Sequence, residues 1–299
     1  MILSSRTTQT SIKRYSTGEK IFKILNFFIL ISLGLICLIP FMHVLARSLS
    51  REGSIQSGLV FIIPVEFNLE SYKIIFTDPE MGKALKFTVI LTILGTAVNL
   101  IMTTLGAYPL SKDYLKGHKI IWVFILITMF FSGGVIPTYM VIMNLGLRNS
   151  IWSLILPGAI SVYNLIIMKT FISSIPDSLE EAAKIDGCTE FGILFKIVLP
   201  LSIPILLTLA LFYGVGHWNQ FFDALLYIDN VDKFPLQLKL RQLIMSDDIR
   251  STASDVADHM PKEGVKAAAI IYATIPILII YPFAQKYFEQ GIMIGSVKG

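Results

Sequence analysis

The stretch that decides the fold is SIPDSLEEAAKIDGCTEFGILFKIVLPLSIP, residues 174–204, a polar segment between two long apolar runs. Ser178 precedes Glu181 by three residues, which is the spacing of a helix capping box, and acidic groups in a first turn suit the helix dipole. Gly187 follows and can take the positive φ of a helix C-cap. The pattern predicts a short capped helix that ends in a glycine turn.

A second amphipathic helix is predicted after this turn. Apolar side chains recur there at the i, i+3, i+4 and i+7 spacing of one helical face, namely Phe191, Leu194, Phe195 and Val198. Pro200 and Pro204 then lead into the next apolar run. We therefore expect a helix–turn–helix whose second helix continues rigidly into a membrane span.

The first predicted helix presents one smooth face. Its members recur at helical spacing and are Leu179, Ala182, Ala183 and Asp186. The alanines would let another surface approach closely. An ordinary structured loop between two spans explains the same residues equally well, because capped amphipathic helices are common.

The composition indicates an integral membrane protein. Of 299 residues, 54% are hydrophobic and only 15% are charged, whereas soluble domains carry about a quarter charged residues. The net charge of +4 suggests no nucleic-acid partner. Cys37 and Cys188 lie in such different surroundings that a disulfide framework is not expected.

Apolar segments along the chain predict an all-α polytopic protein with six transmembrane helices, since a helical span takes about 20 apolar residues. The expected spans are 21–45, 87–110, 120–143, 151–172, 201–228 and 266–285. Gly133 and Gly134, followed by Pro137, mark the expected break within a span.

Basic residues set the expected orientation. They gather in the N-terminal arm and in the loop 111–119, and are Arg6, Lys13, Arg14, Lys20, Lys23, Lys112, Lys116 and Lys119. By the positive-inside rule both regions face the cytoplasm, so residues 174–200 and both termini are expected there too.

The residues that carry a family resemblance lie in the opening stretch: Glu181, Ala182, Ala183, Asp186, Gly187, Leu199 and Pro200. They resemble the EAA motif of bacterial ABC importer permeases, at matching spacing and between the fourth and fifth spans. The resemblance implies a coupling helix that docks into a groove on a cytoplasmic ATPase. Cys188 departs from the pattern, where a small residue such as Ala is usual.

The resemblance covers most of the chain and is nearest to the oligosaccharide and polysaccharide permeases. It implies a cytoplasmic arm 1–20 and a permease domain 21–299 with a coupling loop 174–200 and an external loop 229–265. The implied partners are a second, non-identical permease, an external solute-binding protein and two ATPase subunits, which bind ATP and Mg; this chain itself would hold no cofactor. The implied location is the bacterial cytoplasmic membrane.

The chain's last residues resemble family tails that reach the ATPase dimer interface. Lys298 and Gly299 carry this likeness and are candidate ATPase contacts. A frayed terminus is the alternative.

Candidate solute contacts lie in the stretch HWNQFFD, residues 217–223. Asn219, Gln220 and Asp223 would share one helical face with Gly216, and amide and carboxylate groups suit sugar hydroxyls. Trp218 is adjacent, and Asn164 in the fourth span is a lesser candidate. An interfacial aromatic belt or contact with a partner permease would explain the same residues.

Missing motifs separate the rival functions. The chain has no phosphate-binding G-x-x-x-x-G-K-[ST] loop, no metal-ligand spacing among its four histidines, and no hydrolase motif. Alternatives are an ABC permease for a non-sugar solute or an ion-coupled secondary transporter. The second needs titratable or ion-coordinating groups near mid-membrane, and Asp223 is the only carboxylate clearly inside an expected span, where it lies near one end.

Overall fold

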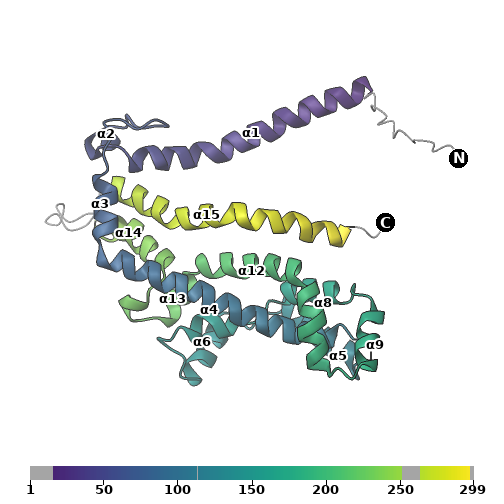
Figure 1. Cartoon of the computed structure of the whole chain (residues 1–299). Coiled ribbons are helices and arrows are strands. Elements are labelled where there is room, and N and C mark those ends of the chain that lie inside the picture. The colour runs from purple at the N-terminus through teal and green to yellow at the C-terminus, as the bar shows by residue number, and fades with distance from the viewer. Residues whose placement is uncertain (1–15, 113, 251–262, 297–299) are drawn as a thin grey trace.

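The computed structural model describes residues 16–112, 114–250 and 263–296, and every regular element within these ranges is helical. Three long helices, α4 (Pro79–Leu110), α12 (Ile203–Trp218) and α15 (Glu263–Ser296), run side by side, while α1 (Thr17–Ser48) diverges from them (Figure 1). The shorter helices are α2 (Glu52–Gln56), α3 (Glu70–Thr77), α5 (His118–Phe130), α6 (Val135–Asn144), α7 (Trp152–Ile155), η1 (Leu156–Gly158), α8 (Val162–Ile172), α9 (Asp177–Ile185), α10 (Glu190–Ile193), η2 (Leu194–Val198), α11 (Leu199–Leu201), α13 (Phe222–Tyr227), η3 (Val231–Lys233) and α14 (Leu236–Arg250).

The expected spans are of two kinds. Among the described residues, α1, α4 and the stretch Glu263–Pro282 of α15 are long and apolar enough to cross a membrane alone. Three further candidates are bent pairs: α5 with α6 at 113°, α7–η1 with α8 at 55°, and α10–α11 with α12 at 80°. The number of spans is therefore three, or up to six if each bent pair crosses once.

The glycine break predicted in the third span is confirmed. The helix α5 ends at Phe130 and α6 starts at Val135, with Gly134 at φ 86° between them. A side chain at that φ would be strained, so glycine is the residue that permits the turn.

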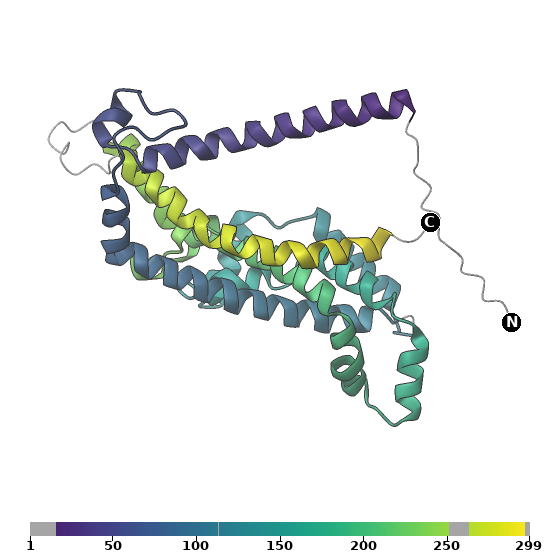
Figure 2. The ribbon, with the colours of Figure 1, turned by 45° about the horizontal axis from the view of Figure 1, so that its top comes forward.

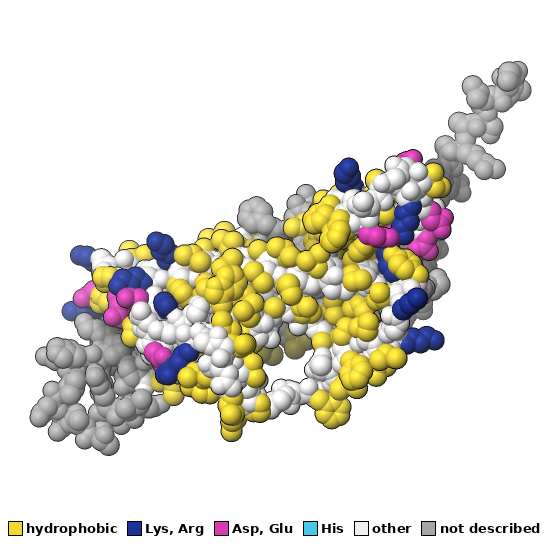
Figure 3. Space-filling model, turned by 90° about the horizontal axis from the view of Figure 1, so that it is seen from below, with side chains coloured by type: hydrophobic (Ala, Val, Ile, Leu, Met, Phe, Trp, Pro, Cys, Tyr) yellow, Lys and Arg dark blue, Asp and Glu magenta, His cyan; other side chains and the backbone are white. Residues whose placement is uncertain are grey.

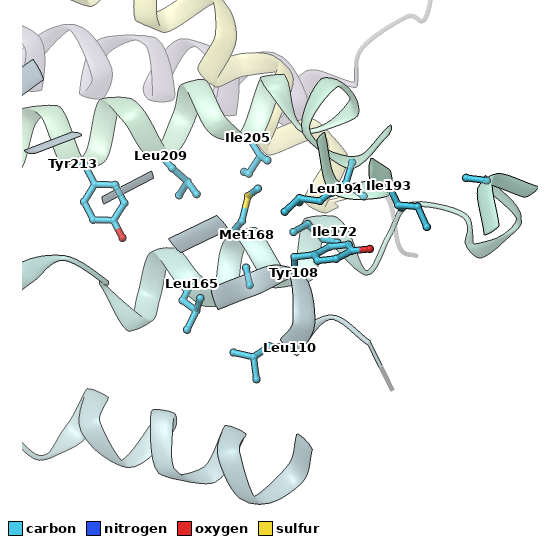
Figure 4. Close-up of a cluster of buried hydrophobic side chains, with 13 residues drawn as sticks. Tyr108, Leu110, Leu165, Met168, Ile172, Ile193, Leu194, Ile205, Leu209 and Tyr213 are labelled. Carbon is cyan, nitrogen blue, oxygen red and sulfur yellow. The ribbon is translucent and has the colours of Figure 1, made fainter. Parts of the chain in front are cut away.

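The core that positions the candidate site lies where α4, α8 and α12 meet the segment after α9. It holds Met168 and Ile172 of α8, Ile193 and Leu194 of a helical hairpin formed by residues 177–201, and Leu209 of α12 (Figure 4). All five side chains are almost fully buried. Removing such side chains from a core costs about 2–5 kcal/mol each, so this cluster fixes the hairpin to the bundle.

A close approach joins α4 to α12 further along. A Cβ built on Gly95 would lie 2.5 Å from Nε2 of His217, so only glycine fits beneath that imidazole. Nearby, the hydroxyls of Thr103 and Tyr213 are hydrogen-bonded at 2.6 Å, and the Tyr213 oxygen accepts the Ser161 N–H. These contacts set the position of α12 against α4.

The surface has the polarity of a membrane protein. Seen from below, hydrophobic side chains cover the middle of the molecule and charged side chains gather toward its ends (Figure 3). The apolar part of α1 buries none of its residues within this chain. An all-round apolar helix of this kind needs lipid or another subunit around it.

Candidate coupling site

The helix α9 starts earlier than the sequence predicts. Pro176 is the N-cap, with φ −59°, and its side chain makes no cap hydrogen bond. Ser178 therefore lies inside the first turn, and the predicted capping box with Glu181 is wrong. The physical reason is that the fixed φ of proline is already suited to helix initiation. Asp177 and Glu180 supply the acidic charge of the first turn.

The predicted glycine turn at the other end of α9 is confirmed. Gly187 has φ 80°, and its N–H donates to the carbonyl of Lys184 at 3.1 Å. The Cys188 N–H donates to the carbonyl of Ala183 at 2.9 Å. These two bonds form a Schellman motif, which satisfies carbonyls that the helix end would otherwise leave free.

The alanine face predicted for α9 is divided in the structure. Ala183 packs into the core of this chain with 7% of its surface exposed, and Glu180, one turn before it, is buried to the same extent. Ala182 and Glu181 are exposed, and Ile185 is 86% exposed. Ala183 therefore belongs to the internal packing surface, and the free face of α9 is formed by Glu181, Ala182 and Ile185.

The second half of the stretch is one helical segment, 190–201, built from α10, the π-helical turn η2 and α11. The Thr189 hydroxyl accepts the Gly192 N–H at 3.2 Å and caps its start. Leu194 and Val198 are buried as predicted, whereas Phe191 and Phe195 are 69% and 59% exposed. The single apolar face predicted from the spacing is therefore wrong for the two phenylalanines.

The joint to the membrane helix is bent. Leu199 and Pro200 lie at the end of segment 190–201, which meets α12 at 80° across Ser202. The predicted rigid continuity is wrong, because Pro200 and Pro204 each lack the N–H that a continuous helix needs. Figure 2 shows the result, a helical hairpin of residues 177–201 that projects from the bundle at the end opposite α3.

Polar contacts fasten this hairpin to the end of α4 and the loop after it. Lys112 forms an ion pair with Glu180, and both side chains are 9% exposed. Glu190 accepts from the Tyr108 hydroxyl at 2.9 Å and pairs with Lys184 at 2.9 Å. The hydrogen bond from Lys184 lowers the pKa of the Glu190 carboxyl. Sequence reasoning missed these partners, because 68 residues separate Lys112 from Glu180.

The candidate solute contacts do not share a helical face. The expected span 201–228 is interrupted, because α12 ends at Trp218 and α13 starts at Phe222. Gln220 donates to Asp223 at 2.8 Å and to the carbonyl of Leu154 at 3.1 Å, so both side chains hold the break together. Gly216 remains inside α12.

The other three candidates have different environments. Asn219 is exposed, although its Nδ2 donates back to the carbonyl of Val215 at 3.0 Å. Trp218 is buried, and its Nε1 donates to the carbonyl of Ala273 in α15 at 3.2 Å. Asn164 is also buried, in the first turn of α8. Of the candidates, Asn219 is thus the one whose side chain is open to a solute.

A cavity of about 560 Å³ lies between α4, α12 and α15. Thr92 and Thr96 are among the residues that line it, but their hydroxyl oxygens are buried, and the lining is almost entirely apolar. Such a lining does not suit a sugar, whose hydroxyls need donors and acceptors. Lys298 and Gly299, the tail candidates, lie outside the described residues.

Comparison with known proteins gives consistent matches. The sequence profile of the family described as "Binding-protein-dependent transport system inner membrane component" matches residues 119–294, which include the hairpin. Protein LplC of Bacillus subtilis is 45% identical, over 94% of this chain and 96% of the relative. The polygalacturonan/rhamnogalacturonan transport system permease protein YtcP of the same species is 44% identical, over 94% and 99%.

A solved structure has the same fold. It is a chain of a bacterial ABC transporter involved in the import of the acidic polysaccharide alginate, and the TM-score is 0.85. The two sequences are 31% identical, and the match covers 92% of this chain and 99% of the other.

Proposed function

Because the chain belongs to the family of binding-protein-dependent transport system inner membrane components, we propose that it imports a carbohydrate oligomer across a bacterial cytoplasmic membrane. The chain is the permease subunit of an ABC importer, and ATP hydrolysis belongs to a separate subunit. Solute arrives on an external binding protein, and a second, non-identical permease completes the pathway.

The free face of α9 is the observation that carries this proposal. Glu181, Ala182 and Ile185 are exposed on the hairpin within the part of the chain that the structure describes, and Ile185 is 86% exposed. A large exposed apolar side chain beside a small one and a carboxylate suits a groove on a partner protein. We assign this face to the ATPase, with Asp186 and Gly187 completing the turn behind it and Leu199 and Pro200 at the joint.

The orientation follows from the same assignment. The hairpin, the end of α4, the start of α1 and the described end of α15 lie at one end of the molecule (Figure 1). Docking to a cytoplasmic ATPase places that end, and with it both termini, in the cytoplasm. We further propose that Lys298 and Gly299, which follow the described end of α15 in the sequence, contact the ATPase.

The solute route is proposed near the break between α12 and α13. Asn219 is the exposed polar side chain there, and we assign it contact with sugar hydroxyls. Gln220 and Asp223 shape the break through their mutual hydrogen bond. Trp218 and Asn164 are assigned to packing, because both are buried.

The names of the relatives suggest which class of carbohydrate to test as the substrate. One of these proteins is named for polygalacturonan and rhamnogalacturonan and another for alginate, and each of these polymers contains acidic sugar units. We therefore propose oligomers of uronic acids as the substrate class. Neutral oligosaccharides of the same length are the comparison.

A purified complex tests the proposal. The chain is expected to copurify with an ATPase subunit, and the loaded binding protein is expected to stimulate ATP hydrolysis. The isolated chain should hydrolyse no ATP. If only uncharged solutes stimulated ATP hydrolysis, the proposed substrate class would be wrong. If the isolated chain hydrolysed ATP, the assignment of hydrolysis to a separate subunit would be wrong.

A further inference from the structure

A buried ion pair joins α9 to the end of α4. Lys112 stands just after the end of α4, and its ammonium pairs with Glu180 in the first turn of α9. The same ammonium lies 5.0 Å from the centre of the Tyr108 ring. Two groups, the Glu180 carboxylate of α9 and the Tyr108 ring of α4, thus contact this ammonium in a site that is largely shielded from water.

A second polar contact lies at the other end of α9. Lys184 pairs with Glu190 at 2.9 Å, and its ammonium lies 5.0 Å from the centre of the Tyr114 ring. Glu190 also accepts from Tyr108 at 2.9 Å and from Tyr114 at 3.3 Å. The helix is therefore fastened at both its first and its last turn to residues 108–114.

Stability alone does not explain the buried pair. Removing two charges from water costs free energy that their attraction often fails to recover, and apolar residues of the same size can be as stable. What an ion pair adds over apolar packing is a defined geometry between the two elements that carry it. Here the pair joins α9, which meets the partner, to the turn that directly follows α4, the long helix beside α12. The N–H of Lys112 donates to the carbonyl of Pro109 in the last turn of α4 at 3.2 Å, which ties this turn to the helix.

The covalent route from α9 to the bundle is the less direct one. It runs through Gly187, along segment 190–201, and across the 80° bend at Ser202 before it reaches α12. A bend between two helical segments can change its angle at small cost compared with a continuous helix. Movement of α9 along this route alone would be partly absorbed at the bend.

We propose that Lys112 and Glu180, supported by Glu190, form a latch that makes α4 move together with α9 during the transport cycle. The three are positioning residues, since they lie behind the docking face and away from the solute. This inference rests on the proposed function and adds to it: the stroke of the ATPase reaches the bundle through α4 as well as through α12.

The test uses the whole importer in proteoliposomes, with uronic acid oligomers as solute. Lys112→Met and Glu180→Gln each remove one charge of the pair. Lys116→Met is the matched control, because it removes an exposed lysine of the same loop. The readouts are copurified ATPase, ATP hydrolysis per assembled complex, and solute taken up per ATP hydrolysed.

A latch predicts a loss of coupling without a loss of hydrolysis. The two pair variants should keep hydrolysis per assembled complex while uptake per ATP falls on the order of tenfold, as coupled buried contacts permit. The control should match the wild type. A purely structural role would instead lower the yield of complex and leave uptake per ATP unchanged, which would overturn the proposal.

Rescue separates the charge pair from either residue alone. Lys112→Arg keeps the charge and should retain coupling. The exchange Lys112→Glu with Glu180→Lys should recover most of the uptake per ATP, because it restores an ion pair between the same two positions. The latch would be contradicted if neither Lys112→Arg nor the charge exchange took up more solute per ATP than Lys112→Met and Glu180→Gln. Absence of uptake by the wild-type complex would refute the proposed function instead.

Discussion

A β-branched residue at Gly187 tests the turn that ends α9. Valine at φ 80° costs about 1–2 kcal/mol, and its strain should displace α9 from the ATPase groove. We expect Gly187→Val to lose most of the copurified ATPase. Gly58→Val is the matched control, because Gly58 has φ 71° and an open surround at the opposite end. Equal ATPase retention in the two variants would contradict the assignment.

The two alanines of α9 should respond differently to the same substitution. Ala182→Trp adds bulk on the free face, so it should block the ATPase while the permease keeps its melting temperature. Ala183→Trp adds bulk inside this chain's core, where overpacking typically costs about 1–3 kcal/mol, so the permease itself should melt earlier. Thermal unfolding and copurification measured on both variants check this. Identical behaviour would mean that the division of the face is wrong.

The Glu190 carboxyl predicts a pH dependence. Its pKa is lowered, first by the hydrogen bond from Lys184. The stabilisation is therefore present above the carboxyl's ordinary pKa and is lost as the pH falls through the lowered value. The melting temperature of the wild type should therefore fall more steeply on acidification than the melting temperature of Glu190→Gln. Parallel curves would show that the contact contributes nothing.

Single residues of the coupling site were partly predictable from the sequence. Gly187 was found because a positive φ leaves a local signal, a glycine directly after a helical pattern. The burial of Ala183 in the core of this chain and the pairing of Lys112 with Glu180 were not predicted, because both depend on which element packs behind α9. No spacing within the stretch itself contains that information.

At the scale of elements, the break between α12 and α13 gives the clearest test. Gln220→Leu removes the hydrogen bonds to Asp223 and Leu154 and leaves their oxygens unmatched, which costs about 1–3 kcal/mol. We expect a lower melting temperature. Asn219→Ala should leave melting unchanged and reduce uptake. If Gln220→Leu instead lowered uptake without changing the melting temperature, and Asn219→Ala lowered the melting temperature, Gln220 would belong to the solute pathway.

The apolar runs predicted where helices lie, but not where they bend. Spans around α4 and α15 were recognisable because a long apolar run has few competing explanations. The break in the third span was predictable from Gly133 and Gly134. The 80° bend at Ser202 was not, since Pro200 and Pro204 permit both a continued and a broken helix in a membrane.

At the scale of the whole molecule, the structure accounts for a subunit that works inside an assembly. None of the residues in the apolar part of α1 is buried by the described part of the chain, and the hairpin 177–201 projects from the opposite side of the bundle (Figure 2). Deleting the hairpin while keeping the spans should leave a protein that inserts into membranes and binds no ATPase. Full ATPase retention by that deletion would move the docking surface elsewhere.

Uptake of a labelled uronic acid oligomer into proteoliposomes shows directly whether this chain is part of an ATP-driven importer. The vesicles contain the assembled importer, with binding protein outside and ATP inside. We predict uptake only when ATP is on the membrane side that carries α9 and the binding protein is on the other side. The variant Ala182→Trp should lose this uptake. Uptake driven by an ion gradient, without ATP or the ATPase, would contradict it.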